Sequence, residues 1–297
     1  MDDPSPLSDA SMTPPGPAGE AVALEHWRQI ARQWRQVGPP LRPTEQDLAV
    51  VGEAIRAWGH RHGQPRALVL GVTPEYYHLP WPAGASVLAV DHTQAMIDAV
   101  WPGPRGAALC AEWTDLPLAA GSRDIALCDG GLHLLAYPHE QQRFVRALHR
   151  VVAPGGLCLL RLFVPPPQRE SPAAVIDDLL RRRIASLSGL KFRLWMALQR
   201  EVARGVALAA VWETVHRVEP DWAQLASHVG WSLEHLSAID TYRDSATRYC
   251  LPTEAAVRQL FCESPGGFTL EARHTPTYEL GGQCPTLVLR RVLRKGT

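Results

Sequence analysis

A short unit of strand, glycine and second strand constrains this chain more than any other stretch of its sequence. The apolar run 67–70 lies between Pro65 and Gly71, which is the pattern of a buried strand in a parallel sheet. A second apolar run, 87–90, ends in Asp91. A glycine turn after one strand and a carboxylate at the end of the next are typical of nucleotide-binding α/β units, because the carboxylate accepts hydrogen bonds from a ribose diol.

Strands and helical patterns alternate over the following residues, which implies a mainly parallel sheet. Three more strands are predicted at 107–111, 124–128 and 157–164. The breaker Pro154-Gly155-Gly156 separates the last of them from a preceding helix. Two final runs, at 268–272 and 286–289, flank a Gly281-Gly282 turn region and predict an antiparallel pair at the sheet edge. The fold class is therefore α/β.

The remaining segments divide the chain further. Residues 1–19 are rich in Pro, Ser, Ala and Gly and predict a disordered tail, and 20–63 predict two helices. The second helix begins at Thr44, with Asp47 completing a capping box. These helices either cover the site as a lid or pack on the sheet, and the sequence does not decide between the two. Residues 64–297 form the α/β domain, with a mostly helical cap at about 166–265.

The composition of the chain limits the classes of partner it could bind and the cellular compartment it could occupy. The chain has 30 basic and 30 acidic residues, so neither nucleic acid nor an anionic membrane is expected as a partner. Six cysteines show neither a C-x-x-C pair nor a metal-ligand spacing, so no metal is expected. Three of them fall in predicted strands, which favours a reducing compartment. No apolar run is long enough to span a bilayer and no signal segment is recognised, so a cytoplasmic protein is expected. Nothing predicts the oligomeric state.

Together these pieces resemble the class I S-adenosylmethionine-dependent methyltransferases. The resemblance rests on the order and spacing of the segments 68–75, 87–97, 110–118, 122–135 and 148–163 and on the terminal strand pair. It covers about residues 64–165 and 266–297. It implies a Rossmann-like sheet of seven strands whose last two form an antiparallel hairpin, with S-adenosylmethionine as cofactor.

The first half of the implied cofactor site follows the first two strands. The resemblance places Gly71, with Val72 and Thr73 after it, under the methionine portion of the cofactor. Asp91 would hold the ribose hydroxyls, although a carboxylate there could also only cap the next helix. His92 and Met96 would flank the adenine, Met96 as an apolar wall.

The second half follows the next two strands. Glu112 takes the place of an acid that accepts the adenine amino group, or is merely solvated, and Trp113 is a backbone donor and wall. Cys128 and Asp129 would lie beside the methionine arm. His133 lies where the target atom approaches, and we expect it to act as a general base unless it is only a satisfied histidine.

The glycine loop departs from the family pattern. Val69, Thr73 and Glu75 occupy places where the family usually has one acidic residue and two glycines. Either the Thr73 hydroxyl or the Glu75 carboxylate replaces a cofactor contact, or the loop no longer binds the cofactor. The second case would make the chain a non-catalytic cofactor-binding or partner-binding protein. A nicotinamide oxidoreductase is disfavoured because residues 71–74 offer no pyrophosphate cradle.

The leading hypothesis is methyl transfer to a small molecule. The balanced charge and the helical cap favour an enclosed site, and we expect residues 170–260 to close over it and select the acceptor. We interpret the tryptophans of the helical segments, Trp27, Trp34, Trp195 and Trp212, as packing. The stretch 242–244 either faces the substrate or forms a surface salt bridge.

Overall fold

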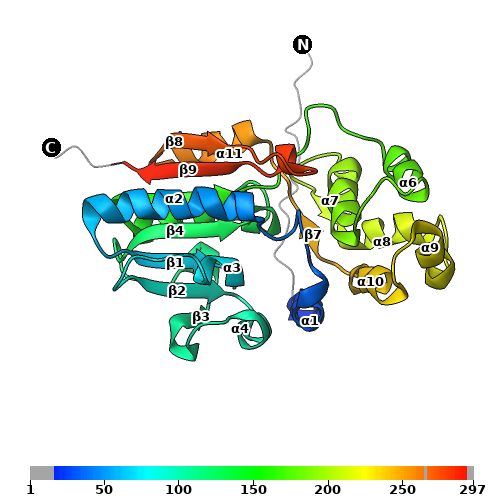
Figure 1. Ribbon diagram of the computed structural model, residues 1–297, viewed down its shortest axis with the longest axis horizontal. Helices are drawn as coiled ribbons and strands as arrows, with labels where there is room; N and C mark the ends of the chain where they lie inside the picture. The colour runs from blue at the N-terminus through cyan, green and yellow to red at the C-terminus, as the bar shows by residue number, and fades with distance from the viewer. Residues whose placement is uncertain (1–16, 264–265, 293–297) are drawn as a thin grey trace, which may run out of the picture.

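A seven-stranded sheet forms the centre of the molecule in the computed structural model, which describes residues 17–263 and 266–292 (Figure 1). The strand order is β3-β2-β1-β4-β5-β9-β8. The strands are β1 Arg66–Leu70, β2 Ser86–Asp91, β3 Ala108–Cys110, β4 Arg123–Asp129, β5 Val152–Arg161, β8 Phe268–His274 and β9 Thr286–Arg291. The first five are mutually parallel, and β9 runs antiparallel to both β5 and β8. The predicted fold class, including the terminal antiparallel pair, is confirmed.

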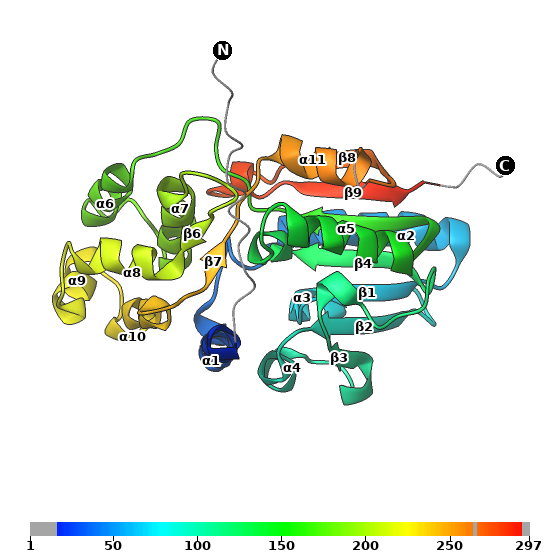
Figure 2. The same ribbon diagram turned by 180° about the vertical axis from the view of Figure 1, so that it is seen from behind.

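Helices cover both faces of this sheet (Figures 1 and 2). One face carries α2 Glu45–His62, α3 Pro74–Tyr77 and α4 Gln94–Val100, and the other carries α5 His139–Val151 and α11 Glu254–Cys262. Side chains of the central strands alternate between the two cores, as the pleat requires. On β1, Val69 packs on the α2 side while Leu68 and Leu70 pack on the α5 side.

The start and end of β5 differ from the sequence prediction. The strand begins at Val152, directly after α5, so the Pro154-Gly155-Gly156 breaker lies inside it rather than before it. The register with β4 shifts between Arg123 and Ile125, which is the irregularity that absorbs the breaker. The strand ends at Arg161 instead of residue 164.

A separate helical cap faces the carboxyl ends of the parallel strands and appears at the right of Figure 1. It contains α6 Pro172–Leu180, α7 Leu187–Leu198, α8 Leu208–His216, α9 Trp222–Val229 and α10 Leu233–Ser237, and a small sheet of β6 Val206–Ala207 and β7 Arg248–Tyr249. These elements enclose their own apolar core. The predicted cap range is too long at its end, because Val257, Leu260 and Phe261 of α11 pack into the core beside α5.

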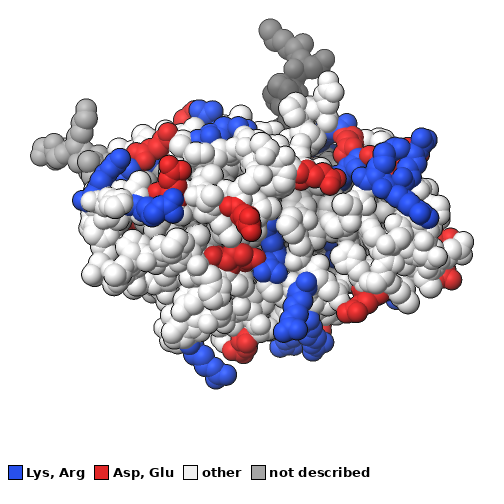
Figure 3. All heavy atoms as spheres, in the orientation of Figure 1, with Lys and Arg blue, Asp and Glu red and all other residues white. Residues whose placement is uncertain are grey.

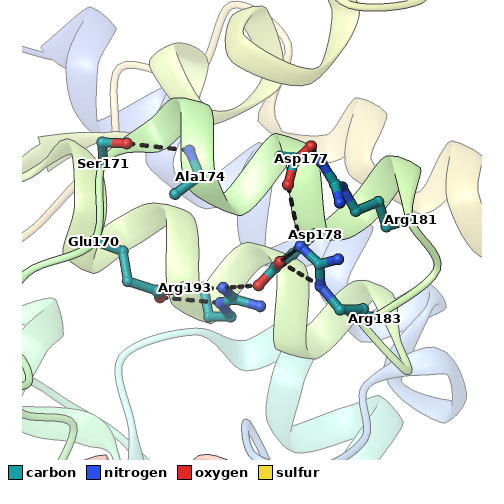
Figure 4. Close-up of polar contacts among 8 residues, drawn as sticks. All are labelled: Glu170, Ser171, Ala174, Asp177, Asp178, Arg181, Arg183 and Arg193. Carbon is teal, nitrogen blue, oxygen red and sulfur yellow. Dashed lines mark hydrogen bonds and ion pairs between the residues drawn. The ribbon is translucent and has the colours of Figure 1, made fainter.

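Ion pairs join the first two cap helices (Figure 4). Arg193 of α7 contacts Glu170 and donates to Asp178 Oδ2 at 2.6 Å. Asp178 also pairs with Arg183, which donates to Asp177 Oδ2 at 3.0 Å. Arg193 is therefore the cation that ties α7 to α6.

The two N-terminal helices have different places. Helix α1, Pro17–Arg32, lies between the cap and the sheet and contacts α4 and the 3-10 helix η5, Ala238–Tyr242. Helix α2 packs on the sheet, and its Thr44 N–H donates to Asp47 Oδ2 at 2.8 Å in the predicted capping box. The predicted tail 1–19 overlaps α1 by three residues, and residues 1–16 lie outside the described part. No helix in the described ranges is both long and apolar enough to cross a membrane.

Candidate functional site

A cavity lies between the carboxyl ends of β1, β2 and β4 on one side and α1 and the cap on the other. It encloses about 1040 Å³ of atom-free space, part of it open to solvent. The lining residues from the sheet side include Leu70, Gly71, Val72, Thr73, Asp91, Met96, Trp113, Asp129, Gly130, Gly131, His133 and Phe163. Those from α1, from the short 3-10 helix η1 (Trp34–Gln36) and from the cap include Trp27, Ile30, Trp34, Ser188, Lys191, Trp195, Tyr242 and Tyr249. Eight of the eleven predicted site residues thus meet in one cavity.

The loop after β1 forms the floor of this cavity. Gly71 has a φ of +89°, which other residues adopt only with strain, and its N–H donates to the Val90 carbonyl at 2.8 Å. Thr73 is buried on the cavity wall, and Glu75 is not among the lining residues because it pairs with Arg42, whose Nε donates to Oε1 at 2.7 Å. Of the two residues proposed to replace a loop contact, only Thr73 therefore faces the cavity.

Asp91 lies at the end of β2, buried on the cavity wall. Its Oδ1 accepts the Thr93 N–H at 2.8 Å, so it caps the start of α4, while Oδ2 accepts no hydrogen bond from any described residue. Burial raises the pKa of Asp91, and the neighbouring His92 opposes that rise. The capping and ligand-binding roles are compatible because each uses a different oxygen.

Three predicted site residues do not line the cavity. The His92 ring lies 5.6 Å from the Trp27 ring, edge to face, on the outer side of Asp91. Glu112 is exposed beyond β3. Cys128 is buried beneath the cavity floor, where burial raises the pKa of its thiol to about 12. The family resemblance implied these three positions, and a resemblance in sequence does not fix the direction of a side chain.

Trp113 lies under the two glycine turns. Its indole Nε1 donates to the Val90 carbonyl at 2.7 Å, and its ring reaches the turns at Gly71 and Gly131. A Cβ at Gly131 would approach the indole within 2.8 Å, so no larger residue fits there without movement. Trp113 is therefore part of the cavity wall, as expected. Its side chain also packs between the turn at Gly71, which follows β1, and the turn at Gly131, which follows β4.

Asp129, at the end of β4, is held by a buried arginine. Arg161 Nη1 donates to Asp129 Oδ1 at 2.7 Å, and Nη2 donates to the Pro40 carbonyl at 2.5 Å. The same guanidinium lies 3.3 Å from Asp47 Oδ1. Burial raises the pKa of Asp129 to about 6, against the opposing charge of Arg161. This network connects the segment before α2 to the cavity.

His133 reaches the cavity but in an aromatic setting. Its ring stacks on Trp195 at 5.5 Å and meets Tyr249 at 4.5 Å and Phe163 at 5.1 Å. Burial lowers the pKa of His133 to about 3, and a hydrogen bond with the Gly130 backbone opposes this effect. An effective general base has a pKa near the working pH, so this environment disfavours the expected role. The histidine instead contributes to the aromatic wall.

Sequence reasoning missed most residues of the far wall. Trp27, Trp34 and Trp195, interpreted as packing, line the cavity, and so does Tyr242, while Trp212 is absent from the lining. The neighbouring Arg243 forms an exposed ion pair with Asp240 at 3.2 Å, as one interpretation of stretch 242–244 expected. That the stretch faces the substrate stays a prediction.

Lys191 was also missed. It is one of two lysines in the chain and stands in the otherwise apolar face of α7. A single lysine among apolar residues at helical spacing is the pattern that indicates a buried amine. The sequence does not show what that helix packs against, so the pattern alone did not place Lys191 in a site.

Comparison with known proteins agrees with this geometry. The sequence profile of a family described as a methyltransferase domain matches residues 68–160. No curated protein sequence matches the chain. Among solved structures, a Rhodobacter sphaeroides protein provisionally named a Zn-dependent alcohol dehydrogenase is similar, with a TM-score of 0.59, 15% identity, and coverage of 92% of this chain and 98% of that one.

Two further structures have lower scores. A SAM-dependent methyltransferase from Methanosarcina mazei has a TM-score of 0.46 and 14% identity, covering 78% of this chain and 94% of that one. Loganic acid methyltransferase with SAH has a TM-score of 0.49 and 11% identity, covering 94% and 97%. At 15% identity the Rhodobacter similarity shows the fold alone.

Within the described ranges, no group of three or more His, Cys, Asp or Glu side chains could hold a metal ion.

Proposed function

We propose that this chain, whose residues 68–160 form a class I S-adenosylmethionine-dependent methyltransferase domain, methylates a small acceptor enclosed under the cap. The observation that carries the proposal is the single cavity shared by the strand ends and the cap. A methyl transfer from a sulfonium needs its acceptor in line and close, so one enclosed space for both partners supplies much of the required alignment.

The residues present fit the cofactor. S-adenosylmethionine supplies a methyl group on a positively charged sulfur. The free Oδ2 of Asp91 would accept a ribose hydroxyl, and Met96 offers an apolar surface to the adenine. The Gly71 turn leaves its backbone exposed to the methionine portion, and the carboxylate of Asp129 and the Thr73 hydroxyl lie on the same wall for its ammonium group.

The surface and the cavity wall support a small, mainly apolar acceptor. Basic and acidic side chains are interspersed on the face in Figure 3, without a broad field of one sign. The far wall of the cavity is aromatic, with Trp27, Trp34 and Trp195 among its members. Such a wall excludes water and binds a flat apolar molecule better than a polymer backbone.

All six cysteines are unpaired, which supports the expected cytoplasmic location.

Calorimetry with S-adenosylhomocysteine tests the cofactor half of this proposal. We expect saturable binding, and Asp91→Ala should weaken it by roughly 1–3 kcal/mol, the usual loss of a charged hydrogen-bond acceptor. The control is Asp98→Ala, which removes an exposed carboxylate on the same α4 helix that accepts a hydrogen bond from Gln94 at 2.9 Å. Its affinity should match the wild type. Absence of binding heat for the folded wild type would contradict the proposal and favour the partner-binding alternative.

A further inference from the structure

Lys191 brings a buried amine to the acceptor side of the cavity. It is 8% exposed, its Nζ donates to the Ala238 carbonyl at 3.2 Å, and it lies 4.5 Å from the centre of the Tyr242 ring. Among the described residues no carboxylate forms an ion pair with it. A buried charge without a counter-ion is costly, so burial favours the neutral amine, and an anionic ligand in the cavity would supply the missing counter-ion.

The residues around the Lys191 amine restrict the chemical class of the ligand. The wall beside it is built from Trp195, Tyr242 and Tyr249, so the ligand is flat and apolar over most of its surface. The hydroxyls of Tyr242 and Tyr249 are the neutral polar groups of that wall, and Lys191 is the one lysine or arginine among the residues that line the cavity. The ligand therefore carries one acidic group at the end of an aromatic body.

We propose that Lys191 binds and deprotonates the acceptor, an aromatic molecule with an acidic hydroxyl group, so that the enzyme is an O-methyltransferase. The inference rests on the proposed function and adds the acceptor class to it. Lys191 touches the reacting oxygen and is therefore a catalytic residue.

The step balances in atoms and electrons. The neutral Lys191 amine takes the hydroxyl proton, so an O–H bond breaks and an N–H bond forms. The acceptor oxygen then forms a bond to the methyl carbon while the carbon–sulfur bond breaks, and its electron pair stays on sulfur. The products are a methyl ether and a neutral thioether, and the lysine ammonium returns its proton to solvent. The ion pair between ammonium and oxygen anion exists only before transfer, which favours product release.

Burial lowers the pKa of Lys191 as a general base requires, and the titratable groups around it carry no charge that would oppose this change. Burial lowers the pKa of Lys191 to about 7, so the amine is partly neutral near neutral pH. His26 of α1 and His235 of α10 are the titratable groups whose charge would act on it, together with the Tyr242 hydroxyl of η5. Burial lowers the pKa of both histidines and raises that of Tyr242, so all three stay neutral around pH 7.

4-Nitrophenol is a direct probe because its anion and its neutral form have different absorption spectra. With S-adenosylhomocysteine present, we expect the wild type to bind it as the anion at slightly acid pH. Lys191→Met, which keeps the apolar stem, should bind the anion roughly ten- to hundredfold more weakly, the loss of one charged hydrogen bond. Lys191→Arg should retain anion binding because it keeps the cation.

Four outcomes would overturn the inference. The first three are the absence of saturable 4-nitrophenol binding by the folded wild type, an unchanged affinity in Lys191→Met, and equal binding of nitrobenzene, which has no hydroxyl. Tighter binding of 4-nitrobenzoate than of 4-nitrophenol would point to a carboxylate acceptor and overturn it as well. Calorimetry with S-adenosylhomocysteine alone separates these results from a failure of the proposed function, since Lys191→Met should leave that affinity unchanged.

A second measurement does not depend on any acceptor. Trinitrobenzenesulfonate reacts only with neutral amines, and the chain has only two lysines, so peptide mass spectrometry resolves each one. We expect Lys191 to be modified with a rate that rises through about pH 7, far below the usual value near 10.4 for lysine. Protection by 4-nitrophenol is expected, and a rate that rises only at strongly alkaline pH would contradict the proposal.

Discussion

At the carboxyl end of β5, Arg161 shows how single residues organise the site. Its side chain is fully buried and forms ion pairs both with Asp129 on the cavity wall and with Asp47 in the α2 capping box. It also bonds to the Tyr278 hydroxyl at 3.0 Å. Two buried carboxylates thus depend on one cation, and that cation connects the cofactor floor to the N-terminal segment.

Arg161→Met should therefore destabilise the protein strongly. Removing the cation leaves Asp129 and Asp47 buried and unpaired, which typically costs about 3–5 kcal/mol. The free energy of unfolding is measured by urea denaturation at neutral pH. The matched control is Arg204→Met, whose pair with Glu201 is exposed and should contribute less than about 1 kcal/mol.

A double variant tests the cause of that loss. Asp129→Asn combined with Arg161→Met removes one carboxylate along with the cation, and we expect part of the stability to return. A double variant no more stable than Arg161→Met would show that packing of the guanidinium, rather than unpaired charge, carries the effect.

At the scale of elements, the cap is a second folding unit set over the strand ends. Its helices have their own core. It meets the sheet domain through α1, through η5 and through His133, whose ring packs on Trp195 and Tyr249 and whose carbonyl accepts the Cys250 N–H at 2.8 Å. The pairs between α6 and α7 in Figure 4 hold its outer edge together. Elements that close over a site are held by contacts whose combined free energy is small, so they can open while the rest of the protein stays folded. The cap can open in this way without unfolding the sheet.

Arg193→Met should loosen α6 selectively. Arg193 is half-buried between Glu170 and Asp178, whereas Arg181 forms one exposed pair with Asp177 and supplies the control Arg181→Met. We expect hydrogen exchange of peptides covering 170–180 to speed up roughly tenfold in Arg193→Met, as a loss near 1–2 kcal/mol implies. Equal exchange in the two variants, or faster exchange throughout the sheet, would contradict a local role.

At the scale of the whole molecule, buried histidines make stability depend on pH. Burial lowers the pKa of His133 to about 3 and that of His26 to about 4. Between those values and the ordinary value of about 6.5, the unfolded chain binds protons that the folded chain does not. The free energy of unfolding contributed by these groups is therefore complete above about pH 6.5 and is lost as the pH falls.

His133→Phe should make this acid dependence shallower. Phenylalanine suits the aromatic wall and binds no proton, so the slope of unfolding free energy between about pH 4.5 and 6.5 should fall by up to about 1.4 kcal/mol per unit. Urea denaturation across that range measures the slope. His274→Phe, the same change at an exposed position, should leave it unaltered, and an unchanged slope in His133→Phe would show that the ring is accessible to protons in the folded state.

Local patterns in the sequence were enough to predict the sheet and the edge of the sheet at which the cavity lies. Apolar runs between glycine and proline breakers define strands independently of the rest of the chain, and parallel strands bring Gly71, Asp91 and Asp129 to one edge. The Pro154-Gly155-Gly156 breaker was misplaced because a bulge continues the strand through it.

Only the tertiary structure decided which side chains meet across the cavity. His92 turns to the Trp27 ring of α1, Glu112 is exposed, and Cys128 of β4 packs in the core beside α5. Lys191 and Trp195 come from a segment far along the chain, where helical periodicity predicts burial but not the surface that buries it. The protonation of His133 depends on the same assembly, because burial among aromatic rings from three separate segments, not the residue's own chemistry, fixes its pKa.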